Sequence, residues 1–396
     1  MAFFRNTAVN MLNAHYGLHQ IAIAGGGAFM LAFLLKAGVE TPFIFLALVG
    51  ILATRFIFRP LVVPLAPYLG LRNLLVLGTF LSAFQYLFIA QVKGLDGWML
   101  AWLIAGGIGD TVYWSSYHAF FAALGDHDHR GSQLGVREAI VALVGIVSPV
   151  LAGWALVAFG PNTAFGATTF FLLVSALPLF FTPNIPVAKS APGAFKAAIP
   201  GFKYFLADGG TVAGFYFCWQ IVLFQSLRES YIAFGGALAF ASLIAAVGGM
   251  FLGRLIDHGH GRRAVYLSVG LYIATIIARA LSQDHAGLAI AANAIGALVI
   301  GLYIPTMMTP VYNLAKRAPC VLRFHVACEG GWDLGGAAGC LLLAFLAWFG
   351  VPLWVGILTA LAGVTWSAAM LLRYYGEHPD VQVLPPDPVL DTQPLP

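Results

Sequence analysis

The chain has 396 residues, of which 60% are hydrophobic and only 9% are charged, with a net charge of +4. So much apolar surface cannot be hidden in one water-soluble core of this length, which excludes a soluble globular protein and favours a chain embedded in a bilayer. No basic patch interleaved with aromatic residues indicates a nucleic-acid partner, and the small positive charge is explained by the loop bias described below.

Apolar runs separated by turns that carry Gly, Pro or charge divide the whole sequence. A helix that crosses the hydrocarbon core needs about 20 mostly apolar residues, and twelve runs meet that need. The predicted spans are 11–35, 42–66, 73–92, 97–122, 133–159, 163–182, 204–227, 231–254, 264–282, 287–310, 324–349 and 352–373. The first run carries His15, Tyr16, His19 and Gln20 near its start, too polar for a cleaved signal peptide, and is expected to be retained.

Lysine and arginine predict the orientation, because both accumulate in the loops that stay on the cytoplasmic side. With the N-terminus inside, most basic residues fall in cytoplasmic loops, and the outer side receives only Lys36, Lys93, Arg228 and Arg279. An even number of spans then places both termini in the cytoplasm. We expect an integral protein of the plasma membrane, the inner membrane of a bacterium.

The chain repeats itself at an offset of about 190 residues, which is typical of two halves built alike. For example, LGLRNLLVLG from Leu69 corresponds to HGRRAVYLSVG from His260. The predicted organisation is an N-terminal six-helix half (1–183), a Pro- and Lys-containing cytoplasmic linker (184–203), a C-terminal six-helix half (204–373) and a disordered cytoplasmic tail (374–396).

One short basic loop between two apolar runs reads GMFLGRLIDHGHGRR, from Gly249 to Arg263. It carries a glycine, an aspartate and then Gly-Arg-Arg, at Gly253, Asp257, Gly261, Arg262 and Arg263. This pattern resembles the signature that the major facilitator superfamily (MFS) of membrane transporters carries between the second and third helices of each half. The resemblance implies a solute carrier with the MFS fold: all-α, with twelve transmembrane helices in two pseudo-symmetric halves.

The corresponding loop of the first half, LAPYLGLRN, departs from this pattern. It keeps Gly70 and Arg72, but Ala66 or Pro67 stands where the aspartate is expected, so the usual latch between halves is not implied there. The loop after the fourth span, LGDHDHRGSQLG, fits the superfamily better. Its residues that resemble a recurring cytoplasmic motif are Asp126, Arg130, Gly131 and Gly135.

Two opposite charges lie near the middle of predicted spans, Arg55 in the second and Asp110 in the fourth. Each charge costs about 2.5–3.5 kcal/mol at a helix centre on insertion scales unless it is paired or hydrated. At about 1.5 Å per residue, both lie at matching depth. Asp110 is therefore either a static partner of Arg55 or a protonatable group that couples transport to protons.

Asp110 also begins a stripe of polar aromatic residues on one face of its helix, since they recur at three or four residues. The resemblance implies that spans 1, 4, 7 and 10 line a central cavity. The candidate cavity residues are His19, Gln20, Arg55, Asp110, Tyr113, Trp114, Tyr117, Trp219, Gln220 and Tyr303. The alternative is that the aromatic residues only fill the core of the bundle.

A second set of charges is predicted nearer the cytoplasm, with Arg59 in span 2 and Glu329 and Asp333 one turn apart in span 11. A glycine row in span 11, Gly331, Gly335 and Gly339, permits close helix packing and leaves the acids free for a cavity or a partner helix. Asp110, Glu329 and Asp333 are the candidates for proton coupling.

In the superfamily, span 2 faces span 11 and span 5 faces span 8, so Arg59 is expected to meet Glu329 or Asp333, and Arg254 to meet Glu138. Such pairs would close the cytoplasmic side between the halves. The candidate gate and signature residues are Arg59, Arg130, Glu138, Gly253, Arg254, Asp257, Gly261, Arg262 and Arg263. Alternatively, Glu138 and Arg254 are interfacial charges that extend to the lipid headgroups.

No metal site or cofactor is predicted, because the histidines that flank Asp128 and follow Asp257 lie in solvated loops. Motifs of ATP-binding proteins, zinc proteases and serine hydrolases are missing (GxxxxGK[ST], HExxH and GxSxG), so neither an enzyme nor ATP-driven transport is expected.

The sequence therefore favours a monomeric secondary active transporter that moves a small solute by alternating access and is driven by protons. Its expected partners are that solute, protons and the lipid bilayer. The alternative is a non-transporting MFS-like membrane factor that delivers a pigment, lipid or subunit to a membrane complex.

Overall fold

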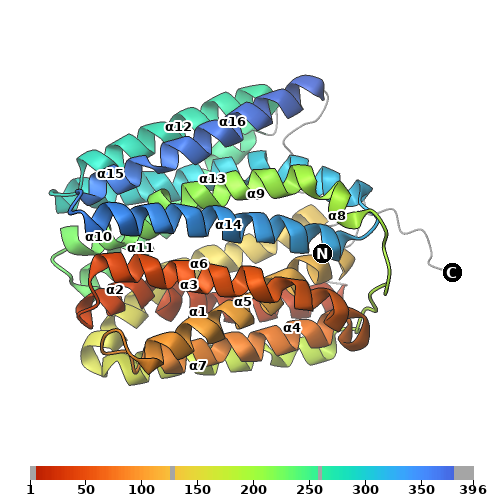
Figure 1. Ribbon diagram of the computed structural model, residues 1–396, viewed down its shortest axis with the longest axis horizontal. Helices are drawn as coiled ribbons and strands as arrows, with labels where there is room; N and C mark the ends of the chain where they lie inside the picture. The colour runs from red at the N-terminus through yellow and green to blue at the C-terminus, as the bar shows by residue number, and fades with distance from the viewer. Residues whose placement is uncertain (1–5, 125–129, 257–260, 379–396) are drawn as a thin grey trace.

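Helices make up the regular structure of the described chain, which in this computed structural model comprises residues 6–124, 130–256 and 261–378; these residues contain no strand. Figure 1 shows the helices lying roughly along one common direction. The first part of the chain forms α1 (Thr7–Ala22), η2 (Ile23–Gly27), α2 (Ala28–Lys36), α3 (Thr41–Phe58), η3 (Arg59–Leu61), α4 (Val62–Ile89), α5 (Gly97–Leu124), α6 (Arg130–Ala158), α7 (Gly160–Ser175) and η4 (Leu177–Phe181). The second part forms α8 (Ala194–Ala197), α9 (Ile199–Val212), η5 (Ala213–Cys218), α10 (Trp219–Ser226), α11 (Tyr231–Ile256), α12 (Gly261–Leu281), α13 (Ala286–Arg317), α14 (Val321–Trp348), α15 (Leu353–Leu358) and α16 (Ala360–Glu377).

Helix occupies each range predicted as a span. Among the described residues, nine helical stretches are long and apolar enough to cross a bilayer, and one of them, Thr41–Ile89, joins α3 to α4 and so covers two predicted spans. The chain is therefore an all-α integral membrane protein, as the sequence predicts. Boundaries differ by a few residues: the helix expected from residue 204 begins at Ile199, because Pro200 is tolerated in the first helical turn.

The helices of residues 7–181 lie in the lower part of Figure 1 and those of residues 199–377 in its upper part. The connecting segment runs along the right edge of the view, past α8. Across the boundary between the two groups, α3 packs against α14 and α6 packs against α11. These are the contacts that the resemblance implies between spans 2 and 11 and between spans 5 and 8. The tail predicted to be disordered lies, from residue 379, outside the described residues.

Two helices are interrupted by π-helical segments at equivalent places in the repeat. Segment η2 starts at Ile23, and η5 starts at Ala213, which is 190 residues further on, the offset found in the sequence. Gly25 leaves helical geometry inside η2, with φ −80° and ψ −107°. Because π-helical turns occur frequently at functional sites, the matched interruptions make the middle of both helices a candidate functional region.

The glycine row of α14 packs against α9, as expected for residues that permit close approach. A Cβ at Gly335 would collide with the backbone oxygen of Leu206, and one at Gly331 would collide with that of Phe202. The acidic residues of α14 therefore point away from α9, toward the other group of helices. This packing decides where the site forms.

The segment after η4 is hydrogen-bonded to the first signature loop, which lacks the expected aspartate. Asn184 Nδ2 donates to the Leu69 carbonyl at 2.8 Å, and its Oδ1 accepts from the Arg72 backbone N–H at 3.1 Å. The Arg72 guanidinium donates to the Thr182 carbonyl at 3.2 Å, and the Leu71 N–H donates to the Ile185 carbonyl at 2.9 Å. The start of the linker is thus bonded to α4 at the kink around Gly70.

Arg323 at the start of α14 donates to the Lys189 carbonyl at 2.7 Å. The linker is thereby held by both groups of helices, at Asn184 and at Lys189.

Replacing Gly70 with alanine should destabilise this end of the protein. Gly70 has φ 75° and ψ 167°, a conformation essentially restricted to glycine, and a Cβ there would collide with the Asn184 side chain. We expect Gly70→Ala to lower the free energy of unfolding by about 1–3 kcal/mol, read as a lower melting temperature in detergent. Gly166→Ala, in open space within α7, is the matched control and should not lower it. An unchanged melting temperature in Gly70→Ala would contradict the assigned backbone geometry.

Candidate functional site

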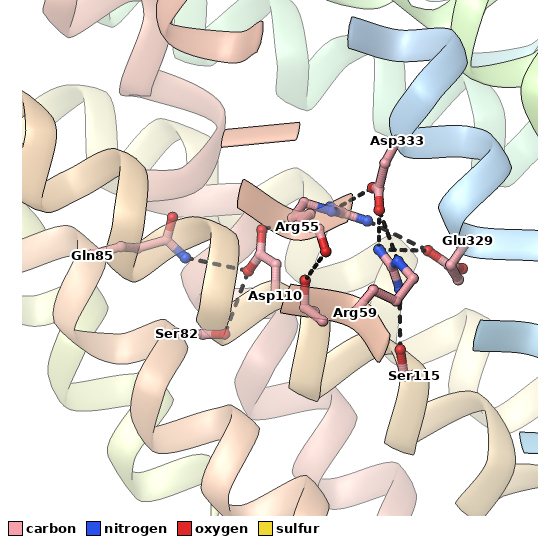
Figure 2. Close-up of polar contacts among 9 residues, drawn as sticks. Arg55, Arg59, Ser82, Gln85, Asp110, Ser115, Glu329 and Asp333 are labelled. Carbon is pink, nitrogen blue, oxygen red and sulfur yellow. Dashed lines mark hydrogen bonds and ion pairs between the residues drawn. The ribbon is translucent and has the colours of Figure 1, made fainter. Parts of the chain in front are cut away.

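Five charged side chains meet where α3 packs against α14 (Figure 2). Arg55 lies on α3 and Arg59, four residues later, begins η3, which continues directly from α3, whereas Glu329 and Asp333 are four apart on α14. Each pair therefore shares one face. Asp110 comes from α5. We refer to these five residues as the charge cluster: Arg55, Arg59, Asp110, Glu329 and Asp333.

The tightest contact of the charge cluster joins Arg59 to Asp333. Arg59 Nε donates to Asp333 Oδ2 at 2.8 Å and Nη2 donates to the same oxygen at 2.5 Å, while Nη1 donates to Ser115 Oγ at 3.1 Å. The side chains are 2% and 0% exposed. This is one of the two pairings expected from the sequence, and it links residues on opposite sides of the boundary between the two groups of helices.

Arg55 lies between carboxylates of both groups of helices (Figure 2). Its Nε is 2.8 Å from Asp333 Oδ1 and its Nη2 donates to Glu329 Oε2 at 3.4 Å, whereas Nη1 is 3.9 Å from Asp110 Oδ2. The guanidinium also lies 5.0 Å from the centre of the Trp332 ring. Its closer acidic partners thus belong to α14.

Asp110 is held by neutral donors more than by cations. Ser82 Oγ and Gln85 Nε2 of α4 each donate to Asp110 Oδ1 at 3.4 Å, which is long for either bond. Thr111 Oγ1 donates to the Arg55 carbonyl and so joins α5 to α3 at the same level. The Asp110 side chain remains 26% exposed, against 8% for Arg55.

Formal charges in the charge cluster do not balance. Two guanidiniums face three carboxylates, which leaves an excess of one negative charge in ionised form. His118, two turns after Asp110 on α5, has its Nε2 3.9 Å from Glu329 Oε1. Its ring stacks on that of His325 of α14 at 5.9 Å. An uncompensated charge is costly in a low-dielectric interior, so the arrangement favours the uptake of one positive charge.

Other candidate cavity residues form an aromatic cluster between α1 and α5. His19 stacks on Tyr113 at 4.0 Å, and His15 Nε2 is 3.2 Å from the Tyr113 hydroxyl. Tyr113 and Tyr117 are buried, whereas Gln20 and Trp114 keep partial exposure. The face presented to solvent is therefore narrower than the predicted stripe: it consists of Asp110, Trp114 and His118 at successive helical turns.

Trp219 and Tyr303 lie apart from the charge cluster, within the core of the second group of helices. Trp219 Nε1 donates to Asn293 Oδ1 at 3.0 Å, and the Tyr303 hydroxyl donates to Ser367 Oγ at 2.7 Å. Gln220 is also buried. These three side chains are buried among the helices of the second group in this structure, and their place in a substrate cavity stays a prediction.

The sequence analysis did not predict that two further charged residues, Asp208 and Arg279, are buried. Asp208 of α9 is 8% exposed and accepts from Trp332 Nε1 at 3.2 Å, beside the charge cluster. Arg279, counted above among the basic residues of the outer side, is buried in the last turn of α12 and donates to the Phe215 carbonyl of η5 at 2.5 Å. Both fall inside predicted spans, so the rule that singled out Arg55 also applies to them.

Several predicted signature residues cannot be placed in the site. Asp257 lies outside the described residues, and for Arg130, Glu138, Gly253 and Arg254 only the helical backbone of α6 and α11 is described. Gly261 begins α12, where a Cβ would collide with the Tyr375 ring of α16, and Arg262 and Arg263 are exposed. Within the described part of the chain, no group of three or more His, Cys, Asp or Glu is arranged to hold a metal ion.

Comparisons with known proteins agree with this fold. Residues 22–322 match the family model described as Major Facilitator Superfamily. A solved structure described as an auto-inhibited POT family peptide transporter is similar in fold, with a TM-score of 0.64 and 12% sequence identity over 93% of this chain and 96% of that chain. A search of the curated proteins finds no match. At 12% identity the structural likeness shows the fold alone.

Removing the carboxylate of Asp333 should strongly destabilise the protein, because two buried guanidiniums would lose their closest partner. We expect Asp333→Asn to cost about 3–5 kcal/mol, measured as a lower melting temperature in detergent. Glu377→Gln is the matched control, since it breaks the exposed Arg373–Glu377 pair, and it should leave the melting temperature unchanged. Equal effects of the two substitutions would contradict a structural role for the buried pair.

Proposed function

Because the chain belongs to the Major Facilitator Superfamily, a family of membrane transporters, we propose that it is a secondary active transporter driven by protons. It carries a small solute by alternating access, with the two groups of helices described above as its two moving halves. The N-terminal half comprises residues 1–183 and the C-terminal half comprises residues 204–373, joined by the linker.

The charge imbalance of the charge cluster is the observation that supports proton coupling. One proton on a carboxylate would neutralise the excess negative charge of two arginines and three acids. The buried site favours this neutral state because charge is poorly solvated there. A proton bound from one side of the membrane and released on the other is the coupling that the proposal requires.

Asp110 is the acid best suited to carry the proton. Asp333 is fully buried and bonded to both arginines, so it acts as the structural partner. Asp110 is more exposed, and its nearest arginine atom is 3.9 Å away. A proton can therefore reach Asp110 from solvent and be exchanged without breaking the strongest ion pair.

Protonation of Asp110 changes how Arg55 is shared between the halves. While Asp110 is ionised, Arg55 interacts with an acid of its own half and with Glu329 and Asp333 of the other half. Once Asp110 is neutral, the attraction of Arg55 is directed to α14 alone, which strengthens the contact between α3 and α14. Loss of the proton weakens this contact and so favours separation of the halves there.

Aromatic contacts join the halves at the opposite end of the bundle. The Phe29 ring of α2 meets the rings of Tyr231 and Phe234 of α11 at 6.1 Å and 5.4 Å, and Phe43 of α3 meets Trp348 of α14 at 5.7 Å. Lys36 Nζ of α2 also lies 5.0 Å from the centre of the Tyr231 ring. None of these contacts involves a carboxylate, so protons are proposed to act on the closure at the charge cluster. Alternating access would open the aromatic end while the charge cluster holds the halves together.

The distribution of basic residues supports the proposed orientation. Five basic residues lie on the side where α3 leads into α4 and α13 into α14. Lys189 is in the linker, Arg262, Arg317 and Arg323 are at helix ends, and Arg72 follows the kink at Gly70 in α4. Loops rich in Lys and Arg remain in the cytoplasm. We therefore place the linker and both termini in the cytoplasm, with the protein as a monomer in a bacterial inner membrane.

Proton coupling is tested in proteoliposomes that contain a pH-sensitive dye and are offered amino acids, sugars, organic acids and organic amines in turn. A transported solute should change the internal pH in the wild type. Asp110→Asn should abolish this change and gradient-driven accumulation in a variant whose melting temperature matches the wild type, because no proton can be bound and released at this position.

Asp96→Asn is the matched control for this substitution. Asp96 lies before α5 outside the membrane, where hydrogen bonds from the backbone N–H groups of Met99 and Lys93 hold the pKa of its carboxyl below the usual range. Asparagine retains the capping oxygen, so coupling should be unchanged. Accumulation that persists in Asp110→Asn, or the transport of no solute at all, would contradict the proposal.

A further inference from the structure

On the premise of the proposed transport function, we propose that the solute is an organic cation that binds between Asp110 and the rings of Trp114 and Tyr216. Both Asp110 and Trp114 belong to α5 of the N-terminal half, and Tyr216 belongs to η5 of the C-terminal half. The substrate class follows from which charges and rings remain accessible at the boundary between the halves.

The arginines of the charge cluster are not available to a bound anion. Arg59 is 2% exposed and Arg55 is 8% exposed, and both are bonded to acids of α14. Asp110, by contrast, is 26% exposed. A carboxylate or phosphate on the solute would therefore meet an acidic surface with its cations already neutralised, whereas an ammonium or pyridinium group would meet an acceptor.

Trp114 lies one helical turn beyond Asp110 on the same face of α5 and keeps partial exposure. Its ring is held edge-on against Tyr113 at 5.1 Å and an interplanar angle of 89°, and lies against His118 at 5.8 Å. These contacts hold the indole on the face of α5 that also carries the Asp110 carboxylate. Indole is the aromatic group that attracts cations most strongly.

Tyr216 faces the same region from the other half. It is 46% exposed, although its neighbours in η5, Phe215 and Cys218, are buried. Phe217, the next residue of η5, contacts the Trp332 ring at 6.5 Å, and that ring lies 5.0 Å from the Arg55 guanidinium of the charge cluster. The π-helical turn thus places an accessible phenol ring beside the segment that reaches the charge cluster, and a bound cation would touch both halves.

A monovalent cation and a proton would neutralise the same excess charge of the cluster. They are therefore expected to compete for Asp110: release of the proton creates the carboxylate that binds the solute, and solute release allows protonation. This competition makes the transporter an exchanger of one proton for one monovalent organic cation.

Equilibrium binding in detergent tests the substrate class without any transport. Three probes share one biaryl shape and differ in charge: 1-methyl-4-phenylpyridinium, neutral 4-phenylpyridine and anionic 4-phenylbenzoate. Titration calorimetry at about pH 8 should give the tightest binding for the cation, by about tenfold or more over the neutral probe. Equal or tighter binding of 4-phenylbenzoate would overturn the proposal, as would no binding of the cation.

Variants assign the binding to the named groups. Tyr216→Leu should weaken cation binding by about fivefold or more, while Tyr216→Phe, which keeps the ring, should bind like the wild type. Asp110→Asn should abolish the preference for the cation over 4-phenylpyridine. Binding unaffected by Tyr216→Leu or by Asp110→Asn, in variants whose melting temperatures match the wild type, would overturn the site.

Competition with protons predicts weaker cation binding at about pH 5 than at about pH 8. The titratable or charged groups facing Asp110 are Arg55 of α3, Tyr86 of α4 and Asp333 of α14, with His118 and Glu329 two turns along. All remain in Asp110→Asn, so loss of the pH dependence in that variant assigns it to Asp110, and its persistence would overturn the competition.

The binding result and the transport result are separable. Cation binding with no proton movement in proteoliposomes would refute the proposed function and leave the site intact. Proton-coupled movement of an anionic or neutral solute, with no binding of 1-methyl-4-phenylpyridinium, would refute the substrate class alone.

Discussion

The contact of Arg55 and Arg59 with Asp333 is the interaction on which the arrangement of the two halves depends. It places full charges inside a bilayer-spanning bundle, where they persist only because each guanidinium finds a carboxylate on the facing helix. The same contact requires α3 and α14 to lie close together at this depth. Breaking it exposes charge to an apolar environment, so separation of the halves there needs a compensating event.

The charge cluster combines a structural task with an exchangeable one because its acids differ in surroundings. Asp333 is enclosed and bonded to both arginines, whereas Asp110 accepts two long hydrogen bonds from α4 and keeps contact with solvent. The difference arises from packing: the glycine row of α14 lets that helix sit directly on α9 and directs Glu329 and Asp333 across the boundary. One excess negative charge then remains for a proton or a cationic solute.

At the cytoplasmic end proposed here, the linker is bonded to the signature loop that lacks its aspartate. Asn184 bonds to the backbone on both sides of Gly70, and Arg323 bonds to the linker further on. The connection between halves is therefore part of the packed structure at its ends. Movement of α14 relative to α4 would be transmitted through this segment, since both helices hold it.

The sequence by itself determined that the chain spans a membrane with repeated helical halves, because apolar runs and the 190-residue offset are local or periodic properties. It also singled out Arg55, Arg59, Asp110, Glu329 and Asp333, since a charge in an apolar run is conspicuous without any structure. Only the tertiary structure decided which charges meet: Arg59 and Asp333 are 274 residues apart, and no local pattern sets their distance. It alone decided that Arg55 is already neutralised, that Trp219 and Tyr303 are enclosed in the core, and that Tyr216 is accessible, because solvent access depends on how neighbouring helices pack.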